Sequence, residues 1–108
     1  MSQHFFNTTY QEKPVIVLIG YDRPMQGFFM VIDYSSGDEE EGYIYSNLFE
    51  EETHPNDLGN YQVKLEELGI RITDEMFKEL EFDQINRIGN KTVRHSIVDG
   101  YYRRQING

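Results

Sequence analysis

The stretch KPVIVLIGYDRPMQGFFMVIDY, residues 13–34, decides the fold because it holds two apolar runs of strand length on either side of a turn. The first run, residues 15–19, is continuous and β-branched, which is typical of a strand buried on both faces. Residues 21–27 are rich in turn formers, and the second run, residues 28–34, follows them directly. This arrangement predicts an antiparallel hairpin.

Residues on either side of the hairpin complete the N-terminal half. Residues 42–48 continue the strand period of two, with Tyr43 and Tyr45 on the same face. We therefore expect a β-meander of three strands. Residues 1–12 lie outside this pattern, and we expect them to be a frayed segment.

The second half changes to the period of a helix. Apolar residues at steps of three or four predict a helix from about residue 58 to residue 68, with Asn56 or Asp57 as its N-cap. Gly69 stands where a left-handed residue would end this helix. Thr73 is a suitable N-cap for a second helix that runs to about Gln84.

A fourth strand is predicted near the C-terminus. Residues 92–98 alternate apolar and polar side chains, and Asp99 and Gly100 then indicate a turn. Residues 101–108 are expected to form a short basic tail, either as a terminal strand or as an extension whose tyrosines pack on the sheet. The order β-β-β-α-α-β predicts one α+β domain over residues 1–108, in which two helices pack on one face of an antiparallel sheet of about four strands.

The charge of the chain is unevenly distributed. The 108 residues include 19 acidic and 10 basic side chains, for a net charge of −9. Residues 24–63 contain nine Asp or Glu and no Lys or Arg, whereas residues 87–108 contain five Lys or Arg against one Asp. Because an acidic surface repels phosphate backbones, nucleic acid is a disfavoured partner. A basic protein suits the acidic half, and the opposite charges of the two ends would also suit a homodimer.

The composition also bears on the cellular compartment. The chain has no Cys, which excludes disulfides, zinc–thiolate sites and thiol nucleophiles and favours a reducing, cytoplasmic location. The longest apolar run, residues 15–19, is too short to cross a bilayer, and the N-terminus shows no export signal. We therefore expect a protein that does not associate with membranes.

Two acidic runs flank the third predicted strand. Seven extended residues separate these runs by roughly 20 Å, so one cation cannot bridge them, and no metal site is predicted. Solvated loops are the simpler interpretation of the runs. The functional interpretation is a surface that docks on a basic partner, with tyrosines supplying contact area. The predicted partner-binding residues are Asp38, Glu39, Glu40, Glu41, Tyr43, Tyr45, Glu50, Glu51 and Glu52.

A second hypothesis concerns a pocket. Tyr21, Asp22 and Arg23 lie together in the first turn, and His95 alternates inward on the fourth strand. They would suit a small ligand-binding domain or an enzyme if the fold brought them together. A structural turn and a hydrogen-bonded core histidine are the simpler interpretations.

Catalytic chemistry has little support in the sequence. The chain carries none of the common nucleophile, phosphate-binding or metalloprotease motifs, so no catalytic residue and no cofactor are predicted. The favoured hypothesis is a small, acidic, non-enzymatic interaction module, an adaptor or an inhibitor, that docks on a basic protein.

Overall fold

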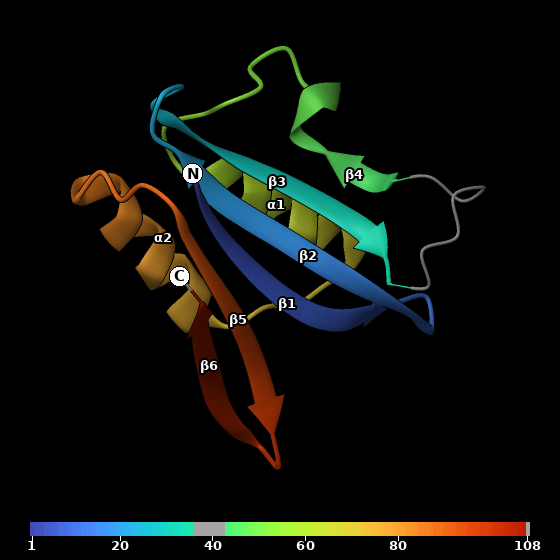
Figure 1. The fold of residues 1–108 in the computed structure, drawn as a ribbon. Coiled ribbons are helices and arrows are strands. Elements are labelled where there is room, and N and C mark those ends of the chain that lie inside the picture. Colours follow the sequence, from blue (N-terminus) through green and yellow to red (C-terminus); the bar gives the residue numbers. More distant parts are fainter. Residues whose placement is uncertain (36–42, 108) are drawn as a thin grey trace.

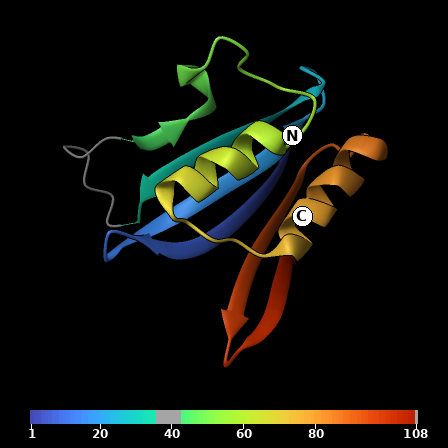
Figure 2. The same cartoon turned by 180° about the vertical axis from the view of Figure 1, so that it is seen from behind.

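A computed structural model describes residues 1–35 and 43–107 of the chain. Within these residues the elements are β1 (Ser2–Tyr10), β2 (Lys13–Asp22), β3 (Gly27–Tyr34), β4 (Tyr43–Ser46), η1 (Asn47–Phe49), α1 (Gly59–Leu68), α2 (Asp74–Ile85), β5 (Lys91–Val98) and β6 (Tyr101–Asn107). The strands form one sheet in the order β4-β3-β2-β1-β5-β6. Both helices cover the same face of this sheet (Figures 1 and 2).

This architecture confirms the predicted α+β class and corrects its details. The sheet has six strands rather than about four. It is mixed rather than antiparallel, because β1 and β5 pair in parallel while the other neighbours are antiparallel. The two additional strands come from the two ends of the chain, predicted as a frayed segment and as a terminal strand or tail.

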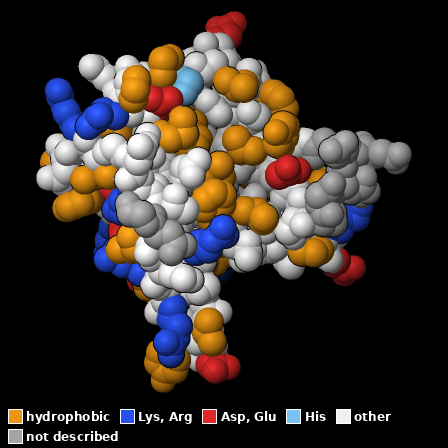
Figure 3. All heavy atoms as spheres, in the orientation of Figure 1, with side chains coloured by type: hydrophobic (Ala, Val, Ile, Leu, Met, Phe, Trp, Pro, Cys, Tyr) orange, Lys and Arg blue, Asp and Glu red, His pale blue; other side chains and the backbone are white. Residues whose placement is uncertain are grey.

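The core lies between the sheet and the two helices. Alternate residues of β2 point into it, and Val15, Val17 and Ile19 are completely buried. Ile16 and Leu18 point the other way and are only half-buried, so the prediction that this strand is buried on both faces was wrong. The helices cover one side alone, and Figure 3, which views the opposite side, shows apolar side chains gathered there.

The N-terminal segment is a central strand and not a frayed end, which corrects the prediction for residues 1–12. β1 lies between β2 and β5. Gln11 and Glu12 join β1 to β2 with φ angles of 50° and 69°, which is the geometry of a two-residue type I′ hairpin. Such turns favour Asn and Gly, so the sequence carries no clear signal for this one. Ser2 and His4 are polar but occupy inward positions, so the sequence of β1 lacks the alternation of apolar and polar residues that indicates a strand.

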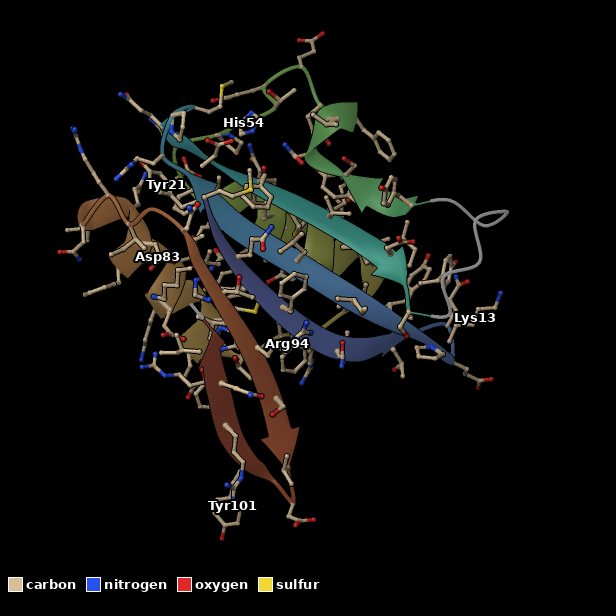
Figure 4. The ribbon with its side chains drawn as sticks, viewed as in Figure 1. Lys13, Tyr21, His54, Asp83, Arg94 and Tyr101 are labelled. Atoms are coloured by element: carbon tan, nitrogen blue, oxygen red, sulfur yellow. The ribbon has the colours of Figure 1, made fainter. Side chains whose placement is uncertain are left out.

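The predicted basic tail also forms a strand. The turn at Asp99 and Gly100 is confirmed, with φ angles of 53° and 81°, and it joins β5 to β6 as a hairpin. This hairpin extends away from the rest of the sheet in Figure 1. Figure 4 shows Tyr101 at its tip. The arginines of the tail therefore lie on an edge strand.

The third strand is shorter than predicted. β4 ends at Ser46, whose hydroxyl accepts a hydrogen bond from the Leu48 N–H at 3.2 Å and so caps η1. The pairing register of β4 with β3 also shifts between Ile32 and Asp33, as a β-bulge does. The strand therefore gives way to a turn before residue 48.

Both predicted helices are present. Gly69 ends α1 with a φ angle of 71°, as predicted, but the N-cap position is Leu58 rather than Asn56 or Asp57. Thr73 caps α2 as predicted, accepting a hydrogen bond from the Met76 N–H at 3.4 Å. In the described part of the chain, no helix has the length and apolar character needed to cross a membrane.

Candidate functional site

The segment after β4 presents acidic and apolar side chains to solvent. Leu48 and Phe49 are 70% and 65% exposed, and residues 50–52, all glutamates, are also exposed. Asn47 anchors the segment. Its side chain is buried, and its Nδ2 donates a hydrogen bond to the Thr53 carbonyl at 2.6 Å. The exposed side chains therefore stand on an anchored turn.

The three glutamates border a hollow between this segment and α1, with a volume of about 430 Å³. We call it the acidic hollow. Its lining residues are Tyr45, Glu50, Glu51, Glu52, Pro55, Asn60, Tyr61 and Lys64. Lys64 is the one cation among these described residues, and its ammonium group lies 5.4 Å from the centre of the Tyr45 ring. The hollow thus carries a negative balance and already holds a cation against an aromatic face.

Burial and the nearby glutamates raise the pKa values of two tyrosines in the hollow. Tyr45 donates from its hydroxyl to Glu50 Oε1 at 3.2 Å. Burial, together with the charge and hydrogen bond of Glu50, raises the pKa of Tyr45 to about 12. Burial also raises the pKa of Tyr61, with further contributions from Tyr45, Glu50 and Glu52. Both hydroxyls therefore stay protonated at neutral pH, and the site disfavours additional negative charge.

The predicted partner-binding residues are only partly brought together. Tyr43 is 59% exposed, whereas Tyr45 is 6% exposed and belongs to the core. The bulge in β4 separates their environments, so these two tyrosines do not share one docking face. Asp38, Glu39, Glu40 and Glu41 lie outside the described residues.

The residues of the predicted pocket are also divided. Tyr21 and Arg23 line a second hollow, of about 630 Å³, together with Pro24, Gln26, Asn56, Gln84 and Arg87. Asp22 instead lies 3.8 Å from His54 and accepts a hydrogen bond from the Met25 N–H. His95 is not among the lining residues of this hollow, so the structure does not join the turn and His95 in one site.

His95 is a hydrogen-bonded core histidine, as the simpler interpretation of the sequence held, and it belongs to a buried polar cluster beneath α2 whose other members were not predicted. Its Nε2 lies 2.8 Å from His4 Nδ1, and His4 Nε2 lies 2.6 Å from Asp83 Oδ2. At the other end, His95 Nδ1 lies 2.6 Å from the Tyr102 hydroxyl. Figure 4 shows Asp83 on α2, beside β5. Strands β1, β5 and β6 and helix α2 therefore each contribute to one chain of hydrogen bonds.

Charged groups complete this cluster. Lys91 donates to Asp83 Oδ1 at 2.9 Å, and Arg104 forms an ion pair with Glu79. Burial alone would raise the pKa of Asp83, but hydrogen bonds from His4, Lys91 and Ser2 outweigh it and lower the pKa. Burial and the nearby charges of His4 and Lys91 lower the pKa of His95 to about 4. At neutral pH the cluster thus contains an ionised Asp83 and an uncharged His95.

Two signals in the sequence could have located this cluster. Asp83 follows Met76 and Leu80 at steps of four and three, so it shares their buried helix face. His4 alternates with Ser2 and Phe6, which all point inward from β1. A carboxylate and a histidine at core positions indicate paired buried groups.

Comparisons with known proteins give this chain no relatives: no protein-family model, no curated protein and no solved structure matches it.

Proposed function

We propose that this protein is a non-enzymatic interaction module, an adaptor or an inhibitor, that docks on a basic protein through the acidic hollow. The observation that carries the proposal is the convergence of three consecutive exposed glutamates on one hollow beside exposed Leu48 and Phe49. The anchored turn keeps this arrangement in place before a partner arrives, which lowers the entropy that binding costs.

The chemistry of the surface defines the partner. A Lys or Arg side chain entering the hollow would meet three carboxylates beside Tyr45, whose ring face already attracts the ammonium group of Lys64. Phe49 packs edge-on against Tyr45, at 6.2 Å between ring centres. Apolar side chains next to that cation would cover Leu48 and Phe49. The partner segment is therefore basic and amphipathic. A contribution of Asp38, Glu39, Glu40, Glu41 and Tyr43 to partner binding stays a prediction from their charge and their place in the sequence.

The setting of the interaction follows from composition. The absence of Cys supports a reducing, cytoplasmic location, where the partner would be found.

The test measures binding of a short fluorescent peptide of Lys, Arg and Leu by anisotropy. We expect the E50Q/E51Q/E52Q variant to bind at least about tenfold more weakly than the wild type, because close charge pairs contribute on the order of 1.5 kcal/mol or more. Rising salt should weaken wild-type binding. The control variant E12Q/E66Q/E81Q removes the same charge from exposed positions elsewhere and should bind within about threefold of the wild type.

Three results would overturn the proposal. Equal weakening by the two triple variants would show attraction by net charge without a site. Retention of a matched peptide of Glu and Leu would exclude recognition of cations. A dimer in analytical ultracentrifugation that E50Q/E51Q/E52Q dissociates would assign the surface to a second copy of this chain.

A small anion is the second candidate ligand, at the hollow lined by Tyr21 and Arg23. Its described lining residues include Arg23 and Arg87 and no carboxylate, unlike the acidic hollow. Titration with inorganic phosphate, followed by shifts of the arginine side-chain NMR signals, tests this function. The R23Q/R87Q variant should lose the shifts, and their persistence would exclude the site.

A further inference from the structure

We infer that His4, His95 and Glu79 form a binding site for one divalent first-row transition metal ion, such as Zn²⁺ or Co²⁺. One ligand atom from each residue lies within 4.8 Å of the others. The site is distinct from the acidic hollow, because it lies beneath α2 and uses β1, β5 and α2. Two imidazoles and one carboxylate form a donor set that proteins use for Zn²⁺ and Fe²⁺.

The hydrogen-bond partners of the two rings fix their orientation. Asp83 Oδ2 lies 2.6 Å from His4 Nε2, and Asp83 Oδ1 accepts a hydrogen bond from Lys91, so the His4 nitrogen is the donor toward this carboxylate. The Tyr102 hydroxyl donates to Glu79 Oε2 at 3.4 Å, which leaves the Tyr102 oxygen to accept from His95 Nδ1 at 2.6 Å. The outer nitrogen of each ring is therefore a donor.

When both rings are uncharged, the inner nitrogens are left with their lone pairs facing each other. His4 Nδ1 and His95 Nε2 are 2.8 Å apart, a distance at which two lone pairs repel unless a cation lies between them. Either an added proton or a metal ion satisfies both atoms. A metal ion also uses Glu79, whose Oε2 lies 3.4 Å from His95 Nε2.

The distances suit a metal after a small movement. With metal–nitrogen bonds of about 2.0–2.1 Å, two imidazole nitrogens lie about 2.9 Å apart at a right angle and about 3.4 Å apart in a tetrahedron. The 2.8 Å and 3.4 Å separations at His95 Nε2 span these values. The rings need to part by roughly half an ångström, and Glu79 needs to move toward His4, because the three ligand atoms lie within 4.8 Å of one another and a tetrahedral site holds them about 3.4 Å apart.

The surroundings of the three ligands support the same assignment. Metal-binding histidines usually donate their second ring N–H to a carboxylate or another oxygen, which fixes the tautomer. Asp83 does this for His4, and Tyr102 does it for His95. Both rings are buried, whereas Glu79 borders a hollow of about 310 Å³ with Lys78, Phe82, Lys91 and Arg104. This hollow gives an ion a route to the ligands.

The test titrates the chelator-treated full-length protein with Zn²⁺ and, separately, with Co²⁺. We expect one ion per chain and a visible Co²⁺ absorption spectrum of low coordination number. Nitrogen NMR of the histidine rings should show metal bound at Nδ1 of His4 and at Nε2 of His95, a signature that a purely structural hydrogen bond does not produce. Mg²⁺, which prefers oxygen ligands, should not compete.

Two variants alter the site in opposite directions. E79Q keeps the size of the side chain but removes the anionic ligand, so we expect Zn²⁺ affinity to fall at least about tenfold. R104Q removes the cation that pairs with Glu79, so we expect affinity to rise about three- to tenfold. Thermal unfolding monitored by circular dichroism establishes that each variant is folded.

Two further variants are matched controls. H54N alters the partly exposed histidine beside Asp22, and E81Q alters an exposed glutamate on the same helix as Glu79. Both should retain wild-type affinity. Loss of binding in H54N would assign the ion to the surface, and failure of the folded wild type to bind Zn²⁺ or Co²⁺ would also overturn the inference.

Discussion

Carboxylates beneath α2 and carboxylates around the acidic hollow differ in how their charge is compensated. Asp83 is completely buried, and its two oxygens face His4 and Lys91 at 2.6 Å and 2.9 Å. The glutamates of residues 50–52 are exposed, and Lys64, the one cation among the described lining residues of their hollow, forms its ion pair with Glu67. The carboxylate group thus stabilises the fold in one region and remains available to a partner in the other.

Because of this difference, substitutions in the two regions should change different quantities, stability in one region and binding in the other. A buried charge is stable only while its partners are present, so its loss appears in the free energy of unfolding. An exposed charge contributes little to folding but can direct binding. The two regions should therefore respond to similar substitutions with opposite patterns of stability and affinity.

The largest effect is expected for Asp83→Asn. This change removes the carboxylate from His4 and leaves Lys91 without its partner. Breaking a buried ion pair in this way typically costs about 3–5 kcal/mol. Urea unfolding measures the change, and E81Q on the same helix is the control. A loss below about 1 kcal/mol would contradict the view that buried charges are committed to the fold.

Asn47→Ala should have the next largest effect and should link the two regions. The amide of Asn47 is buried and satisfies the Thr53 carbonyl at 2.6 Å. Leaving such a carbonyl unpaired costs about 1–3 kcal/mol. Because the anchored turn carries the glutamates, affinity for the basic peptide should also fall. Asn60→Ala removes an exposed amide from the hollow. If it destabilised the protein equally, the anchoring role of Asn47 would be wrong.

A smaller effect is expected at high pH from Tyr45. Its pKa is about 12 in the folded protein against 10.0 ordinarily, so the folded state holds this proton more tightly. The resulting stabilisation is complete below pH 10 and is lost as pH rises through 12. At pH 11 the loss amounts to about 1 kcal/mol.

The matched variant for this measurement is Tyr45→Phe, which cannot titrate. It also loses the hydrogen bond to Glu50, but that loss is the same at pH 9 and pH 11. Urea unfolding at both pH values should therefore show a smaller decline for Y45F than for the wild type. Identical declines would show that the acidic hollow does not hold the Tyr45 proton.

How far the sequence predicts the fold depends on whether local signals and packing agree. The central hairpin, both helices, Gly69 and Thr73 follow from periodicity and capping, because the residues that favour each element also point toward the core. β1 does not follow, since its inward residues Ser2 and His4 are polar and its turn lacks Gly or Asn. β6 was left open between a strand and a tail, because only its pairing with β5 in the folded hairpin decides between them.

The candidate sites divide in a similar way. Glu50, Glu51 and Glu52 were predicted from charge alone, since a run of like charges is recognisable without the fold. The cluster at His4 depends on residues 79 and 91 positions away in the sequence. Only the parallel pairing of β1 with β5 and the packing of α2 bring them together. Sequence periodicity assigns such residues to an inner face but not to one another.

The smallest effect on stability is expected for Glu51→Gln, and this prediction sharpens the contrast between the two regions most. Glu51 is exposed and lines the acidic hollow, so its free energy of unfolding should stay within about 0.5 kcal/mol of the wild type. Affinity for the basic peptide should nevertheless fall several-fold, because one of the three carboxylates is lost. Asp83→Asn should show the reverse pattern. Its free energy of unfolding should fall, while the molecules that remain folded should bind the basic peptide with wild-type affinity. If E51Q lost as much stability as D83N, the surface glutamates would have a structural role. That result would contradict the proposal that the acidic hollow is a docking site.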